Sequence, residues 1–381
     1  MRQAVAFLAI FAALAIPWAG TADAAGSPSE LLGFSYRMDA GRQGDAAGLP
    51  AGTAAGGPDA GLHSSALSLP ARLEELLLKP EIAIPAPVPV SVPPAGPGQA
   101  TAYENLWDRI RGGFAMDNLN SPLVDRWQTS YLARPQILKG ILERSRRYLF
   151  HVVEEASRRG MPLELALLPM VESGYNPAAL SSAQASGLWQ FIPSTARDYK
   201  LHLGPDYDAR RDIVASTSAA LDYLRDLHDL FGDWHLALAA YNWGEKSVAR
   251  AIEQNAARGR RTDFGSLALP EETRNYVPKL QALKNLIAYP DAFRLELEPI
   301  PNEPYFTTVA NDRSIDFAVA ARLSGVSLQE LKGLNPGHNG PAVSKNAATG
   351  LVLPVEQAGI FLTNFQTYKN ATPPKPAKRR K

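Results

Sequence analysis

One glutamate at the end of an apolar run is the residue of this sequence best placed for acid–base chemistry. Glu172 closes the run LLPMVE at 167–172. Met161 and Pro162 predict a helix start and Gly174 its end, so the carboxylate falls in the last helical turn. The helix dipole and the apolar neighbours both disfavour an ionised carboxylate there. A glutamate whose pKa is raised from roughly 4.3 towards 6 suits a general acid.

Two features keep the interpretation of Glu172 open at this point. A glutamate at a helix end is also consistent with an ordinary surface residue that faces water. Pro169 lies inside the predicted helix, where it removes a backbone donor, so we expect a kink near the middle of that helix. The choice between chemistry and surface therefore depends on the residues that follow.

Polar motifs follow Glu172 in a fixed order along the chain. Glu172 and Ser173 are followed by Ser181, by GLWQ at 187–190 and by AYN at 240–242. The ordered series resembles the lytic transglycosylases of glycoside hydrolase family 23, which are fold relatives of goose-type lysozyme. Within that family it is most similar to the membrane-bound lytic murein transglycosylase D type. The resemblance covers about 103–289 and continues more weakly to about 359.

The resemblance implies a role for each motif residue. Glu172 would be the catalytic acid and base, and the Ser181 hydroxyl would orient the reacting sugar. Tyr276 belongs to ETRNYV at 272–277, which is similar to a family segment, and it would either floor the cleft or lie in the core. The predicted substrate-binding residues are Ser173, Ser181, Gly187, Trp189, Gln190, Tyr241, Asn242 and Tyr276.

Several of these assignments have a structural alternative. Tyr241 and Asn242 would also fit as satisfied buried polar residues. Trp189 offers a flat face to a sugar ring, but it would equally fit the core. One departure from the family pattern is Gln184 before Ala185, where glycine is commoner. No metal-ligand cluster, phosphate loop or serine–histidine–acid set stands out, so we expect no cofactor and no metal site.

The number of carboxylates bears on the reaction. Ordinary hydrolysis of a glycosidic bond usually takes two carboxylates, and this sequence offers one good candidate. The resemblance implies that Glu172 protonates the oxygen between N-acetylmuramic acid and N-acetylglucosamine, and that the 6-hydroxyl of the sugar then closes a 1,6-anhydro ring. Asp208 and Asp212 are the nearest second carboxylates, but Asp212 precedes an amphipathic run and suits a helix cap. The alternatives are a lysozyme-type muramidase and a noncatalytic peptidoglycan-binding protein.

The predicted fold is mainly α, with a lysozyme-like helical catalytic domain and a small βααβ LysM-like C-terminal module. Apolar residues recur at helical spacing from Tyr103 onwards. The predicted divisions are a signal peptide at 1–24, a linker rich in proline, glycine and alanine at 25–100, a helical segment packing on the catalytic domain at 101–160, the catalytic domain at 161–295, the module at 300–360 and a basic disordered tail at 361–381.

The C-terminal module is predicted from its own pattern. Strands at 305–309 and 350–353 enclose helices at 314–323 and 327–334, which resembles a lysin motif that binds N-acetylglucosamine chains. The match is degenerate, because Asn311 stands where glycine usually precedes the aspartate at Asp312. A docking domain is the alternative. We expect that removal of 305–381 weakens retention on murein and spares the cleavage of short soluble glycans.

The two ends of the chain and its composition predict location and partners. A charged start, an apolar run and Ala22, Asp23 and Ala24 predict a cleavable secretory signal and a periplasmic protein. With no cysteine, we expect no disulfide and no lipid anchor. The balance of 39 basic and 38 acidic residues disfavours nucleic acid. Peptidoglycan glycan strands are the expected partner, and the tail KPAKRRK would contact anionic wall polymer or membrane weakly.

Overall fold

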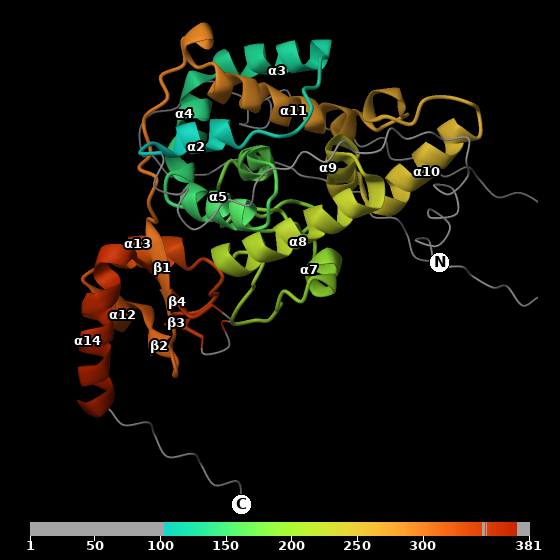
Figure 1. Ribbon diagram of the computed structural model, residues 1–381. Coiled ribbons are helices and arrows are strands. Elements are labelled where there is room, and N and C mark those ends of the chain that lie inside the picture. Colours follow the sequence, from blue (N-terminus) through green and yellow to red (C-terminus); the bar gives the residue numbers. More distant parts are fainter. Residues whose placement is uncertain (1–102, 345–346, 348, 372–381) are drawn as a thin grey trace, which may run out of the picture. The chain divides into compact units, whose positions relative to one another are not determined.

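The computed structural model describes residues 103–344, 347 and 349–371. The predicted signal peptide, the predicted linker and residues 372–381 lie outside these described residues. Helices make up most of the described chain, and short strands occur only towards its C-terminal part within the described residues (Figure 1). The predicted fold class, a lysozyme-like helical domain with a small LysM-like module, is confirmed.

Four helices precede the residues of the predicted site. They are α2 (Leu106–Gly112), α3 (Pro122–Leu132), α4 (Pro135–Ser145) and α5 (Leu149–Arg158). Prolines stand in the first turn of α3 and of α4, where a missing N–H leaves no hydrogen bond unmade. Figure 1 shows α3 running beside α11 (Glu271–Ala288), and α5 packs on α8 (Ile213–Phe231). This segment therefore covers the helices that hold the site.

The helix that was predicted around Pro169 is two short helices. A 3-10 helix, η2 (Leu163–Leu167), is followed by α6 (Leu168–Glu172). Pro169 lies in the first turn of α6, so its missing N–H breaks no bond and a break replaces the expected kink. Every residue of η2 and α6 is buried. Glu172 is the last residue of α6, and its side chain is buried with the rest of the helix.

The remaining helices of this part share one hydrophobic core with α6. They are α7 (Pro193–Asp198), α8, α9 (Trp234–Trp243), α10 (Glu245–Ala256) and α11, with short 3-10 helices η3 (Phe264–Ser266) and η4 (Asp291–Phe293). Asp212 and Asp233 cap α8 and α9, each accepting a backbone N–H at 2.8 Å. Helix α9 is buried from Leu236 to Asn242, as its apolar sequence requires.

The C-terminal module has the predicted strand–helix–helix–strand order. Strand β1 (Phe306–Val309) pairs antiparallel with β4 (Leu351–Pro354), so that Phe306 lies opposite Pro354. Helices α12 (Phe317–Ser324) and α13 (Leu328–Leu334) lie between them in sequence. A second antiparallel pair, β2 (Ile315–Asp316) with β3 (Ala342–Val343), was not predicted.

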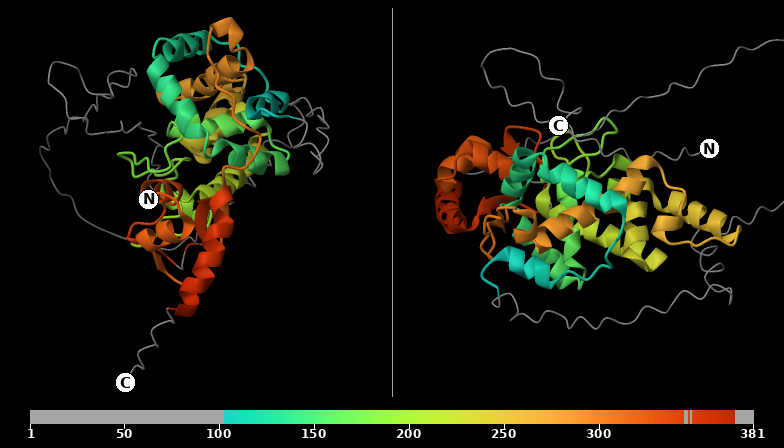
Figure 2. Two further views of the ribbon diagram at one scale, coloured as in Figure 1. Left: turned by 90° about the vertical axis from the view of Figure 1, so that its left-hand side faces the viewer. Right: turned by 90° about the horizontal axis from the view of Figure 1, so that it is seen from above.

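The predicted tail at 361–381 is wrong for its first part. Helix α14 (Val355–Ala371) packs on α12 and on the β1–β4 pair (Figure 2). Phe361 and Phe365 are buried in the module core, and Tyr368 packs against it. These aromatic residues recur at intervals of four and three, which is the spacing of one helical face. This face is buried against the module, which explains why residues 361–371 are helical where the sequence predicted a disordered tail.

The module shares a core with the helical part. Phe306, Leu334 and Val352 belong to the hydrophobic cluster formed by the helices before the module. At the same boundary, the hydroxyl of Tyr148 donates to the Gly333 carbonyl at 3.2 Å. The module is therefore packed onto the helical part through apolar and polar contacts.

Candidate active site

Glu172 is buried at the end of α6. Its side chain is buried, with 3% of the residue exposed, and it accepts a hydrogen bond from the hydroxyl of Tyr276 on α11. Burial raises the pKa of Glu172 from its ordinary value of 4.5 to about 8. The Tyr276 hydrogen bond lowers this pKa, Glu272 raises it and Lys279 lowers it. The carboxyl group is therefore protonated at neutral pH, more fully than the sequence had indicated.

Three polar side chains on one face of α11 act on Glu172. Glu272, Tyr276 and Lys279 are separated by four and three residues, so they share a helix face. Burial lowers the pKa of Lys279 to about 8, while Glu272 and Glu172 raise it. The Lys279 ammonium lies 4.7 Å from the centroid of the Trp127 ring on α3. The sequence motifs did not identify Lys279, Glu272 and Trp127 as residues of the site. Glu272 and Lys279 lie at helical spacing from Tyr276, and this spacing could have indicated them.

The serines of the predicted site bond to the backbone of the loop after α6. The Ser173 hydroxyl donates to the Leu188 carbonyl at 2.9 Å, so it joins the end of α6 to the GLWQ segment. The buried Ser181 oxygen accepts the Ala185 N–H at 3.0 Å, and the Ser181 N–H donates to the Ala185 carbonyl at 2.8 Å. Ser181 keeps its own hydroxyl hydrogen for donation to another group. Both serines thus shape the loop that follows Glu172.

The GLWQ segment is held in a conformation that requires glycine at its start. Gly187 has φ +88°, and a Cβ there would lie 1.9 Å from the Arg210 carbonyl oxygen. Trp189 is 0% exposed, and its indole N–H donates to the Thr217 hydroxyl at 3.0 Å. The prediction that Trp189 binds substrate is therefore corrected. A ring without exposed surface cannot stack on a sugar, and Trp189 is a core residue.

Two amide side chains near the site carry unused polar atoms. Gln190 donates to the Gly187 carbonyl at 2.8 Å, and Asn242 accepts the Thr273 hydroxyl at 2.8 Å. Within residues 103–371 as described, Gln190 Oε1 and Asn242 Nδ2 are buried without a hydrogen-bond partner. Leaving a buried polar atom unpaired costs about 1–3 kcal/mol. One hydrogen-bond acceptor, Gln190 Oε1, and one donor, Asn242 Nδ2, are therefore left unpaired among the described residues.

Tyr241 links the AYN motif to the GLWQ segment. Its hydroxyl donates to the Trp189 carbonyl at 2.7 Å, and 3% of the residue is exposed. Burial raises the pKa of Tyr241 well above its ordinary value, and the charge of Glu172 acts in the same direction. The tyrosine therefore stays neutral and fixes the backbone between the motifs that lie around Glu172.

The two aspartates considered as second carboxylates have structural contacts. Asp208 forms a salt bridge with Arg210, with an oxygen–nitrogen distance of 2.7 Å. Asp212 caps α8 through Ala215 and accepts the hydroxyl of Tyr207. Both carboxylates therefore serve to hold their loop. The carboxylate whose charge acts on Glu172 is Glu272.

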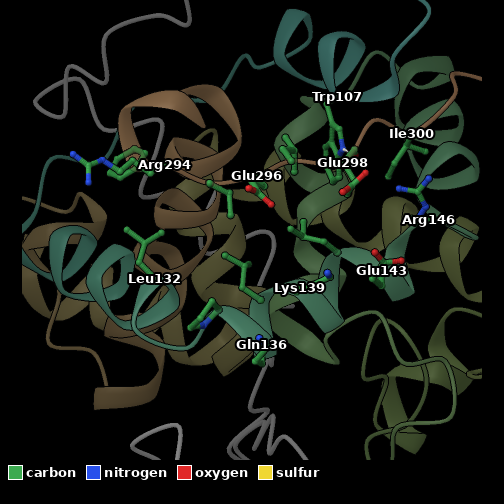
Figure 3. Close-up of a pocket in the computed structure, with 16 residues that line it drawn as sticks. Trp107, Leu132, Gln136, Lys139, Glu143, Arg146, Arg294, Glu296, Glu298 and Ile300 are labelled. Atoms are coloured by element: carbon green, nitrogen blue, oxygen red, sulfur yellow. Dashed lines mark hydrogen bonds between the residues drawn. The ribbon is translucent and has the colours of Figure 1, made fainter.

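A separate cavity lies between α4 and the segment after α11 (Figure 3). It has a volume of about 380 Å³, and Lys139, Arg146 and Glu298 are among the residues that line it. None of its 16 lining residues belongs to the motifs around Glu172.

Among the described residues, no helix is both long enough and apolar enough to cross a membrane.

Comparisons with known proteins agree with the motifs. Residues 152–264 match the transglycosylase SLT domain, and residues 305–370 match the LysM-like domain of the lytic transglycosylase MltD. The membrane-bound lytic murein transglycosylase D of Escherichia coli (strain K12) is 37% identical over 255 residues, which cover 67% of this chain and 56% of that protein. The resemblance drawn from the motifs is thereby confirmed.

Other relatives match shorter stretches. A protein of Alteromonas sp. (strain M-1) named for tributyltin chloride resistance is 47% identical over 110 residues, or 29% of this chain and 53% of that protein. The membrane-bound lytic murein transglycosylase C of Glaesserella parasuis is 32% identical over 140 residues, or 33% of this chain and 38% of that protein. This chain thus spans little more than half the length of the first relatives it matches.

Proposed function

We propose that this chain, with an SLT domain at 152–264 and a LysM-like module at 305–370, is a peptidoglycan lytic transglycosylase. It cleaves the β-1,4 bond between N-acetylmuramic acid and N-acetylglucosamine and leaves 1,6-anhydromuramoyl ends. The observation that carries this proposal is the buried carboxyl group of Glu172 with the Tyr276 hydroxyl bound to it. Burial raises the pKa of this carboxyl group to about 8, as a general acid requires.

The first step uses the proton that Glu172 carries at neutral pH. Glu172 donates this proton to the glycosidic oxygen, the bond from C1 of the muramoyl sugar to that oxygen breaks, and C1 gains positive charge. Glu172 is then a carboxylate. The hydroxyl of Tyr276 and the charge of Lys279 both favour the carboxylate form, so they stabilise this state.

The second step returns Glu172 to its starting form. The carboxylate removes the proton from the 6-hydroxyl of the same sugar while that oxygen bonds to C1, which closes the anhydro ring. No water molecule enters the product, and one carboxyl group serves as acid and then as base. The free acceptor of Gln190 and the free donor of Asn242 fit the N-acetyl and hydroxyl groups that must be held during both steps.

A hydrolytic muramidase is the second candidate, because Glu272 lies within electrostatic reach of Glu172. Hydrolysis places a second carboxylate to activate water or to attack the sugar. Replacement of Glu272 by glutamine separates the two reactions. The transglycosylase should keep most of its turnover, since the proton transfers use only Glu172, whereas a muramidase that depends on Glu272 should lose it.

The location and partners follow from the same reaction. We propose that the protein is exported to the periplasm, where its substrate lies, and that the LysM-like module binds the glycan strands of peptidoglycan. The basic chain end at 375–381 would add weak attraction to anionic wall polymer or membrane.

The experiment that tests the proposal compares the parent with Glu172→Gln and Glu303→Gln on purified murein. Glu303 is exposed and serves as the matched control. Muropeptide release should fall by at least about a hundredfold for Glu172→Gln, since general acid–base assistance contributes about 10²- to 10⁴-fold. It should not change for Glu303→Gln. Release by Glu172→Gln at more than about a tenth of the parent rate would exclude Glu172 as the acid.

A further inference from the structure

The loop at 204–212, called here the module-facing loop, is bound by the C-terminal module. The Asp208 N–H donates to the Gly337 carbonyl at 2.8 Å. Asn339 donates from its backbone to the Asp206 carbonyl at 2.9 Å and from its side chain to the Pro205 carbonyl at 3.0 Å. The module therefore forms hydrogen bonds with the backbone of Pro205, Asp206 and Asp208 in this loop.

Side chains of the module complete the contact. The Thr349 hydroxyl donates to Asp212, which also accepts the hydroxyl of the buried Tyr207 and caps α8. A Cβ at Gly337 would lie 2.9 Å from the Tyr207 ring and 3.2 Å from the Asp208 carbonyl oxygen. The backbone of the module thus approaches the loop as closely as a residue without a side chain allows.

Arg210 connects the module-facing loop to the loop after Glu172. Its buried guanidinium binds the Asp208 carboxylate at 2.7 and 3.0 Å. On its other side, it donates to the Gln184 carbonyl at 2.5 Å and to the Phe191 carbonyl at 3.2 Å. Gln184 precedes the GLWQ segment by three residues and Phe191 directly follows it, and Gly187 of the segment lies against the Arg210 backbone.

We infer that the C-terminal module positions the loop at 181–191 beside Glu172, through the module-facing loop and Arg210, and so contributes to turnover as well as to retention on murein. The inference rests on the proposed function. The loop carries Gln190 and Ser181, whose placement sets the position of the sugar relative to Glu172. A small displacement of such groups lowers the rate of the chemical step. The module is therefore a positioning element, in contrast to the expectation that its removal spares cleavage.

The test uses Thr349→Val, which removes the hydroxyl bound to Asp212 and keeps the size of the side chain. Thr363→Val is the matched control, because Thr363 is exposed on α14 and bonds only within that helix. The readout is the steady-state cleavage of short soluble murein glycans, which need no retention on an insoluble wall. We expect kcat to fall about threefold to tenfold for Thr349→Val with KM unchanged. Thr363→Val should match the parent.

A double-variant comparison separates positioning from a general loss of structure. Arg210→Lys keeps a positive charge for Asp208 but removes the guanidinium that holds two carbonyls. If the module acts through Arg210, Thr349→Val should lower kcat little further in the Arg210→Lys background. Independent effects that multiply, or a parent kcat in Thr349→Val, would overturn the inference.

Two further measurements close the test. Asn339→Ala is the second variant, for use if Thr349→Val does not fold. It changes an exposed residue of the same contact and should also lower kcat. A parent kcat in folded Asn339→Ala would also overturn the inference. Anhydromuramoyl products that the parent forms and Glu172→Gln does not form would establish the proposed function separately, so a failure of the module inference leaves that result intact. A parent without turnover would instead contradict the proposed function itself.

Discussion

Replacement of Glu172 by glutamine should change the pH dependence of stability, because it removes a buried ionisable group and keeps the shape of the side chain. The folded protein holds the Glu172 pKa at about 8, above the ordinary value of 4.5 that applies in the unfolded chain. Between these two values the folded state binds more protons than the unfolded state. The free energy of unfolding contributed by Glu172 is therefore fully present below pH 4.5 and is lost as the pH rises towards 8.

The magnitude follows from the size of the pKa increase. A change of one pKa unit corresponds to about 1.4 kcal/mol, so the increase to about 8 makes the parent roughly 4 kcal/mol less stable at pH 8 than at low pH, from this group alone. Glutamine does not titrate. Glu172→Gln should therefore equal the parent near pH 4.5 and exceed its stability by roughly 4 kcal/mol at pH 8.

The assay is chemical denaturation at several pH values between 4.5 and 8, followed by tryptophan fluorescence, for the parent, Glu172→Gln and Glu303→Gln. The exposed Glu303 controls for the loss of one negative charge. The difference between Glu172→Gln and the parent should grow with pH, and the difference for Glu303→Gln should stay small. Curves for the parent and Glu172→Gln that run parallel over the whole range would refute the assignment of a raised pKa to Glu172.

Further substitutions address individual contacts. Tyr276→Phe removes the donor to Glu172, so cleavage of soluble glycan should fall by roughly 10- to 100-fold, the worth of a hydrogen bond to a charged group; an unchanged rate would contradict the carboxylate-stabilising role. Ser181→Ala should lower turnover by up to about tenfold, because it removes one hydrogen-bonding hydroxyl. Ser182 is exposed, so Ser182→Ala should have little effect on turnover. A larger loss in Ser182→Ala than in Ser181→Ala would place the functional hydroxyl on Ser182. Trp189→Ala should destabilise the fold by about 3–5 kcal/mol in chemical denaturation, and lost sugar affinity with unchanged stability would restore Trp189 as a binding residue. The rate of glycan cleavage should fall as the pH rises through about 8, where Glu172 loses its proton.

The local sequence was sufficient to place Glu172 and the module. An apolar run that ends in a glutamate and a glycine determines a helix end, and the structure ends α6 at that glutamate. The alternation of strand and helix patterns at 305–353 predicted the order of β1, α12, α13 and β4. Both features depend on residues that are close in sequence, which is why the pattern alone could show them.

Features that depend on tertiary packing were not visible in the sequence. The indole of Trp189 would fit a sugar or a core equally well, and only its position against Thr217 decides for the core. The contact of Lys279 with Trp127 joins two helices about 150 residues apart in sequence. Arg210 was unremarked because its role depends on carbonyl groups of another loop, which carry no side-chain signal.

The measurement that tests the central claim most directly is the mass of the products formed from murein in water labelled with heavy oxygen. If Glu172 acts as both acid and base and the sugar supplies its own nucleophile, the new muramoyl ends should be anhydro sugars, lighter by one water molecule than reducing ends and free of the label. Reducing muramoyl ends that carry the heavy oxygen would show that water is the nucleophile, and would contradict the account.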